Sequence, residues 1–176
     1  MRTYEAKPWF VQAESDLRTA NALRTGPSPM ISNDVGCHVS AMCAQVVEKS
    51  IKGYVMVNGA TPSLNHRPDK YLSLLLMKGN PLLRHRDHYT HLSKLFDSST
   101  KHAVKALFEL TPGGKDHRTD VPNTEYPWQV GGAWKEAPAG STQFNDDIVD
   151  EMLKLAKRIQ NMLHRLAISA LRVSEL

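Results

Sequence analysis

Residues 33–56, NDVGCHVSAMCAQVVEKSIKGYVM, are the stretch that decides the fold. Their apolar side chains recur at steps of three and four residues, which is the spacing of one face of a helix. Asn58 and Gly59 then favour a turn with a positive φ angle, and Pro62 prevents the helix from resuming. We therefore predict a long central helix with an apolar stripe formed by Val35, Val39, Met42, Val46, Val47, Ile51, Tyr54 and Val55.

Length and composition indicate a single domain over residues 1–176. The chain is 41% hydrophobic and 23% charged, which is ordinary for a soluble protein with one core. Its first residues lack an apolar segment of signal-peptide length, and its longest apolar run is far too short to cross a bilayer. We expect a cytoplasmic protein that does not contact a membrane. Cys37 and Cys43 point in different directions on the central helix, so we expect both to be reduced packing residues.

Further helices follow from the same spacing and from turn signals. Pro8 is suited to the first position of a helix that precedes the central one. A short helix is expected over residues 68–77, and another begins at Pro81 and extends to Phe96. Asp97 or Ser98 can cap the next helix, which is expected to end near residue 110.

The last helix is expected to begin at a Ser141 or Thr142 cap and to run for about 30 residues, or about 45 Å. One small bundle does not cover that length, so its end is predicted to pack on a second subunit in a homodimer. Residues 111–140, rich in proline, glycine and aromatic side chains, are predicted to form a long irregular loop. Because β-type alternation is scarce, the sequence predicts an all-α, up-and-down bundle of four to five main helices.

Positive charge is concentrated between residues 78 and 105. This segment holds six Lys or Arg against Asp87 and Asp97, together with four histidines. Such an excess favours an anionic partner, such as RNA or a nucleotide. The alternative is an ordinary solvated helix face.

Several motifs occur in a recognisable order. The first helix carries Ala13, Asp16 and Leu17 after a tryptophan, and residues 44–52 of the central helix read AQVVEKSIK. A loop with a proline and a histidine follows, and residues 125–127 read EYP. This order resembles the HEPN family of helical bundles, which have a four-helix-bundle core. The resemblance covers about residues 9–165.

The resemblance implies a module that binds a nucleotide, RNA or a nucleotidyltransferase partner, with a toxin–antitoxin or defence system as one setting. Glu48, Lys49, Lys52 and Tyr126 would then contact the nucleotide or the partner. Glu125 stands where the family has an arginine, which weakens a phosphate-binding role for that tripeptide. The alternative for the central helix is a Glu48–Lys52 ion pair, four residues apart, on a solvated face.

Other members of the family are metal-independent endoribonucleases that use an arginine and a histidine at a dimer cleft. Arg86 and His91 form such an Arg-x4-His pair in this chain. Histidine can act as a base near neutral pH, and arginine can clamp the phosphate. Asp87 lies four residues before His91 and could orient its ring. Enzyme activity is therefore an alternative function, and a histidine-rich surface segment is the competing interpretation.

We expect no metal and no cofactor. His85, His88 and His91 recur every three residues, but the chain contains no Glu-x-x-His pair of the kind that bundle metal sites use. Its Gly-Gly pairs also lack the context of a phosphate-binding loop. A structural helical protein without a ligand remains a third hypothesis.

Overall fold

The computed structural model describes residues 3–26, 32–62, 69–76, 88–110, 122, 124 and 128–173. In this part of the chain it is an all-α bundle, which confirms the predicted fold class. A two-stranded antiparallel hairpin is appended to the bundle. The elements are α1 (Thr3–Thr25), α2 (Ser32–Val57), α3 (Asp69–Leu75), α4 (His88–Leu95), α5 (Ser98–Glu109), β1 (Trp128–Val130), β2 (Ala133–Glu136), a 3-10 turn η1 (Thr142–Phe144) and α6 (Asp146–Val173).

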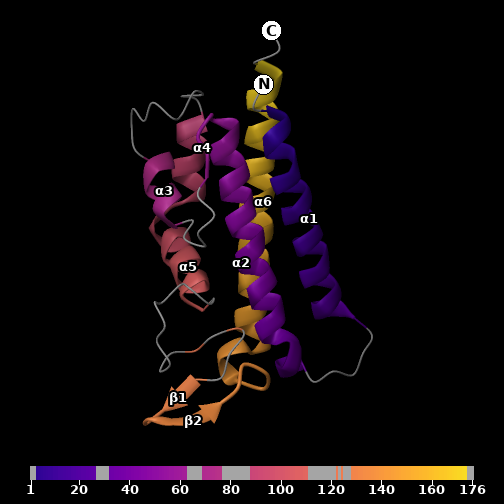
Figure 1. The fold of residues 1–176 in the computed structure, drawn as a ribbon, viewed down its shortest axis with the longest axis vertical. Coiled ribbons are helices and arrows are strands. Elements are labelled where there is room, and N and C mark those ends of the chain that lie inside the picture. Colours follow the sequence, from indigo (N-terminus) through magenta and orange to yellow (C-terminus); the bar gives the residue numbers. More distant parts are fainter. Residues whose placement is uncertain are drawn as a thin grey trace.

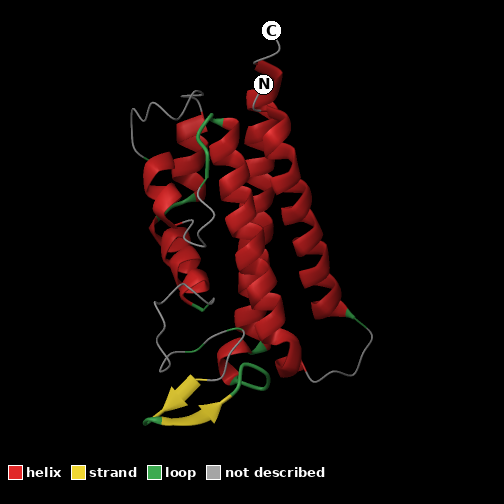
Figure 2. Ribbon diagram, viewed as in Figure 1, coloured by secondary structure: helices red, strands yellow, loops and turns green. Residues whose placement is uncertain are grey.

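The long helix α2 lies at the centre of the bundle (Figure 1). Helices α1 and α6 pack along it, and α3, α4 and α5 lie on its other side. Helices α4 and α5 follow one another with only Phe96 and Asp97 between them, and the chain runs up and down along the bundle (Figure 1). The hairpin lies at one end, beside the start of α6 (Figure 2). None of the described helices is long and apolar enough to span a membrane.

Helix α2 is buried almost all round, because it has neighbours on every side. Small residues make this possible where another chain segment approaches closely. A Cβ atom at Gly36 would overlap the carbonyl oxygen of Phe144. One at Gly53 would lie 2.9 Å from Cε2 of Phe10 and 3.1 Å from Cβ of Trp9. The two glycines therefore set the distance from α2 to η1 and to α1.

Two predicted boundaries are wrong. Helix α1 begins at Thr3, so Pro8 lies inside it rather than at its start. Helix α6 begins at Asp146, where the side chain of Asn145 accepts a hydrogen bond of 3.0 Å from the N–H of Ile148. The predicted cap Ser141 instead begins η1, where its hydroxyl accepts from the N–H of Gln143.

The predicted Asp97 cap of α5 is confirmed. Its carboxylate accepts a hydrogen bond of 2.7 Å from the N–H of Thr100, in the first turn of the helix. This bond satisfies one of the backbone donors that a helix start leaves without a partner inside the helix.

The predicted loop at 111–140 is wrong over residues 128–136, which form the β1–β2 hairpin. Gly131 and Gly132 make the turn with φ angles of 61° and 80°. A two-residue hairpin turn with two positive φ angles strongly favours glycine, and a Gly-Gly pair between two short strand-like segments is its sequence signal. Nearly all of residues 111–127 lie outside the described residues.

Candidate functional site

Glu48 and Lys52, two of the predicted partner-binding residues, form a buried ion pair on α2. Lys52 Nζ lies 2.5 Å from Glu48 Oε1, and the two residues are 2% and 4% exposed, respectively. The ammonium group also lies 5.5 Å from the ring centre of Trp9 on α1, where the face of the indole attracts a cation. The predicted pairing is therefore confirmed, but the predicted solvated face is wrong, because α1 covers this side of α2.

Lys49 belongs to a second pair that joins the same two helices. Its Nζ atom lies 2.5 Å from Oδ2 of Asp16, whose other carboxylate oxygen accepts a hydrogen bond of 2.8 Å from Gln12. Asp16 is 8% exposed. Two of the motifs on which the family resemblance rests, one on α1 and one on α2, are thus in contact. We call Trp9, Gln12, Asp16, Glu48, Lys49 and Lys52 the polar layer.

The polar layer satisfies its own charges within one chain. Moving two ions out of water costs several kcal/mol each, and only close pairing offsets that cost. Both lysines of this layer have a carboxylate partner at ion-pair distance. The layer is therefore arranged to orient α1 on α2, and an added anion would have to displace an existing carboxylate.

Of the three predicted catalytic residues, only His91 is among the residues that the structure describes. Arg86 and Asp87 lie outside the described residues, as does Tyr126 of the predicted binding set. His91 is exposed on α4. The Arg86–His91 pair therefore stays a prediction, and its candidate base lies on a face that is open to solvent.

His88 is the histidine that packs into the bundle. It is 7% exposed, and its Nδ1 atom lies 2.8 Å from the hydroxyl of Tyr54 on α2. Burial raises the pKa of Tyr54 to about 12, so the hydroxyl keeps its proton near neutral pH and can donate it. The sequence signal for this role was helical spacing, since His88 precedes the buried Leu92 and Leu95 by four and seven residues.

The largest accumulation of exposed positive charge among the described helices lies on α6. From residue 152 to 173 this helix has five Lys or Arg and no Asp or Glu. Four of these cations are exposed and lie on one side of the helix, at spacings of three, one and seven residues. We call these four the basic stripe: Lys154, Lys157, Arg158 and Arg165.

The N-terminus of α5 lies against the basic stripe of α6. Arg158 donates a hydrogen bond of 2.7 Å to the hydroxyl of Thr100. The N–H of Thr100 holds the pKa of Asp97 below its usual value, and the positive charges of Arg158 and Lys101 add to this effect. Cations from both helices thus converge on one carboxylate. Exposed Lys94 precedes it on α4.

An open groove of about 710 Å³ lies between α5 and α6. Lys154 and Arg158 line it toward the middle of α6, whereas Asp147 and Glu151 line it toward the start of that helix. Lys154 also pairs with Glu151 at 2.8 Å. The groove therefore has a basic and an acidic end, and an anion is favoured only at the basic end.

Within the described part of the chain, no group of three or more His, Cys, Asp or Glu side chains could hold a metal ion. Cys37 and Cys43 are both buried and are not joined to each other by a disulfide, as predicted. Burial raises the pKa of the Cys43 thiol to about 12, which makes it a packing group rather than a nucleophile.

Comparison with protein-family models, with curated proteins and with solved structures finds no match for this chain. The HEPN resemblance therefore rests on the motifs alone.

Proposed function

We propose that the chain is a HEPN-like helical module that binds RNA through the basic stripe of α6 and the neighbouring cations of α4 and α5. The observation that carries the proposal is the contrast in burial between its cationic clusters. Lys49 and Lys52 are paired inside the bundle, whereas Lys157 and Arg165 are exposed on a helix segment without any carboxylate.

The spacing of the stripe suits a nucleic-acid backbone better than a single small anion. Lys154 and Arg165 are eleven residues apart, which corresponds to about 16 Å along a helix. Such a row can contact successive phosphates without reading bases, so it favours binding with little sequence preference.

Fluorescence anisotropy with a labelled single-stranded RNA tests the proposal. Four phosphate contacts predict that the logarithm of the association constant falls with the logarithm of salt concentration with a slope of about −3. Arg165→Glu should weaken binding about tenfold and reduce that slope by about 1. Arg18→Glu makes the same charge change at an exposed position of α1 and should have little effect. Equal effects of the two variants would remove the basic stripe from the proposal.

The same RNA, incubated with protein in EDTA and analysed by gel, tests the endoribonuclease alternative. Cleavage that is lost in both Arg86→Ala and His91→Ala, with folding intact, would assign an enzyme. Intact RNA would leave a binding module. If RNA neither binds nor is cleaved, a nucleotidyltransferase subunit becomes the favoured partner, ahead of a structural protein without a ligand. The predicted homodimer also belongs to the proposal.

A further inference from the structure

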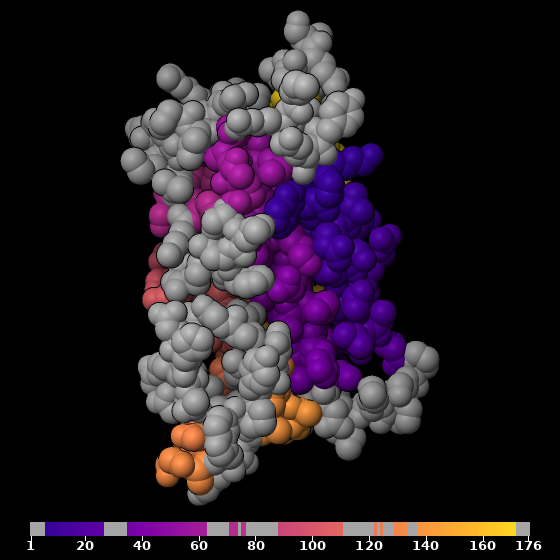
Figure 3. Space-filling view, viewed as in Figure 1, coloured from indigo at the N-terminus to yellow at the C-terminus, as the bar shows by residue number. Residues whose placement is uncertain are grey.

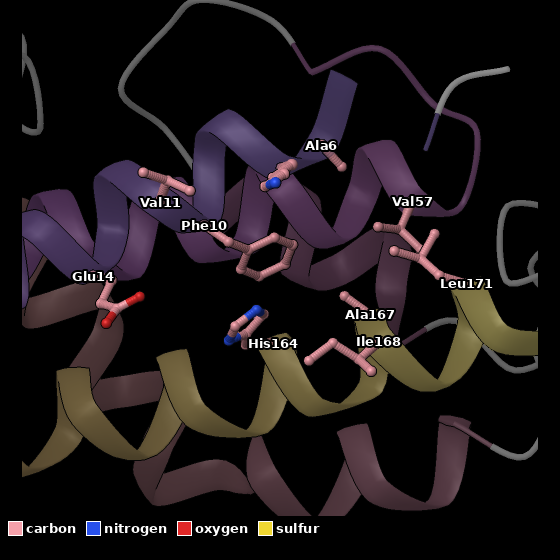
Figure 4. Close-up of a pocket in the computed structure, with 10 residues that line it drawn as sticks. Ala6, Phe10, Val11, Glu14, Val57, His164, Ala167, Ile168 and Leu171 are labelled. Carbon is pink, nitrogen blue, oxygen red and sulfur yellow. The ribbon is translucent and has the colours of Figure 1, made fainter. Parts of the chain in front are cut away.

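An apolar groove of about 420 Å³ lies between α1 and α6, near the start of α1 and the end of α6 (Figure 4). The rings of Phe10 and His164 form its floor, stacked with their centres 5.1 Å apart. Small side chains at Ala6 and Ala167 keep it open.

The rim of this groove exposes large apolar side chains. Val11 is 53% exposed and Ile168 is 39% exposed, and they line the groove from opposite helices. The described part of the chain exposes only a few other large hydrophobic residues, which are Leu23, Val130 and Ile148. Helix α1 forms one edge of the molecule in the face that Figure 3 shows.

On α1, two opposite charges lie at equal distances on either side of the apolar centre of the groove. Lys7 and Glu14, both exposed, line the groove from α1. They are seven residues apart, which puts them on the same side of the helix at a separation of about 10 Å. Val11 and Phe10 lie midway between them. On this side of α1, basic Lys7 and acidic Glu14 thus flank an apolar centre, and Glu14 also pairs with Arg18, one turn further along the helix, at 3.9 Å.

We propose that this groove is where a second copy of the chain docks, around a two-fold axis that passes between Phe10 and Val11. A two-fold axis perpendicular to α1 makes the two α1 helices antiparallel, so Lys7 of each copy faces Glu14 of the other. The same operation packs Val11 of each copy into the partner's groove. The charge order on α1 is therefore self-complementary only in this antiparallel arrangement.

This inference gives a surface to the homodimer of the proposed function, and it is tested without RNA. Light scattering during gel filtration should give a mass near twice 19.7 kDa for the wild-type chain. Lys7→Glu and Glu14→Lys should each weaken self-association about tenfold or more, because each places like charges opposite one another twice. Val11→Ser should also weaken it, whereas Val130→Ser, at an exposed valine on β1, should not.

Mixing the Lys7→Glu and Glu14→Lys variants provides the decisive measurement. In a mixed dimer, the glutamate introduced at position 7 of one chain would face the lysine introduced at position 14 of the other. The unchanged Glu14 of the first chain would face the unchanged Lys7 of the second. The mixture should therefore associate as the wild type does, although neither variant does so alone.

The double charge-swap variant, which carries both substitutions in one chain, should also recover self-association. Circular dichroism would check that every variant is folded.

A wild-type chain that stays monomeric, single variants that dimerise normally, or a mixture that fails to associate would each overturn the inference. Neither Lys7 nor Glu14 belongs to the basic stripe. Loss of RNA binding in Arg165→Glu with normal self-association would therefore leave this inference standing, and the reverse result would leave the RNA proposal standing.

Discussion

The lysines of α2 and those of α6 have opposite environments, although each helix has two lysines three residues apart. On α2, Lys52 is 2% exposed, paired with Glu48 and covered by Trp9. On α6, Lys157 is exposed in a segment that holds no carboxylate. The Lys52–Glu48 pair helps to orient α1 on α2. Lys157 remains accessible to a partner. A lysine-rich helix face therefore indicates binding only where no other element packs over it.

The largest predicted effect concerns the buried pair. Lys52→Met should lower the free energy of unfolding by about 3–5 kcal/mol, because it leaves the Glu48 carboxylate buried without this partner. Urea unfolding followed by circular dichroism measures this loss. Glu48→Leu combined with Lys52→Met should recover most of it, since both charges are then removed.

Lys154→Met on the exposed face of α6 is the matched control, and it should leave the free energy of unfolding nearly unchanged. A Lys52→Met protein that is as stable as the wild type would contradict the buried-pair interpretation and would put the polar layer in contact with solvent.

The next effect is a loss of stability in alkali that originates on α2. Burial raises the pKa of Cys43 from 9.0 to about 12, so the unfolded chain releases this proton first as the pH rises. The stability that the neutral thiol contributes is present below pH 9.0 and is lost toward pH 12. Between pH 9.0 and about 12, the free energy of unfolding of Cys43→Ala should therefore fall less steeply than that of the wild type. The two slopes should differ by up to about 1.4 kcal/mol per pH unit. Urea unfolding at a series of alkaline pH values measures the difference.

Tyr54, whose pKa is raised to about 12 by burial, should cause part of the remaining alkaline loss in both proteins. Identical pH dependence of wild type and Cys43→Ala would show that the thiol is not buried in the folded protein.

The third effect tests how closely η1 approaches α2 at Gly36. Gly36→Ala should destabilise the fold by about 1–3 kcal/mol, because the added methyl group overlaps the backbone of Phe144. This loss should appear in chemical unfolding although alanine favours a helix over glycine by about 1 kcal/mol. Asn161→Ala at an exposed site of α6 should show a propensity gain without the clash. Stabilisation by Gly36→Ala would contradict the close approach.

The smallest effect concerns the Asp97 cap at the start of α5, beside the basic stripe. Because the N–H of Thr100 lowers the pKa of Asp97, the ionised carboxylate stabilises the fold above pH 3.8, and this contribution is lost as the pH falls further. Asp97→Asn keeps a capping side chain, so it should match the wild type near neutral pH and show a weaker acid dependence. Thermal unfolding at a series of pH values measures both, and an unchanged acid limb would contradict the capping interaction.

Much of the fold was predictable because it depends on local spacing. The limits of α2, predicted at residues 33–56 and observed at Ser32–Val57, follow from an apolar stripe and a strong stop signal. The Asp97 cap likewise requires only its neighbours. The β1–β2 hairpin was not predicted, although its Gly-Gly pair is a turn signal, because strands of three and four residues are too short to show a clear alternation.

The candidate site was less predictable, because burial is not a local property. Spacing correctly paired Glu48 with Lys52, yet it could not show that Trp9 lies above them. The partnership of Lys49 with Asp16 joins residues 33 positions apart. His88 and His91 look alike in the sequence, and only the packing of α4 against the bundle separates a buried hydrogen-bonded ring from an exposed one.

The sequence by itself determined the long helices, the Asp97 cap of α5, the position of the central helix and the charge that each segment carries. These depend on side-chain periodicity and on contacts within a few residues. Only the tertiary structure decided which of those charges are paired inside and which face water, because that depends on which helix lies against which. The same spacing of two lysines thus belongs to a structural contact on α2 and to an exposed surface on α6.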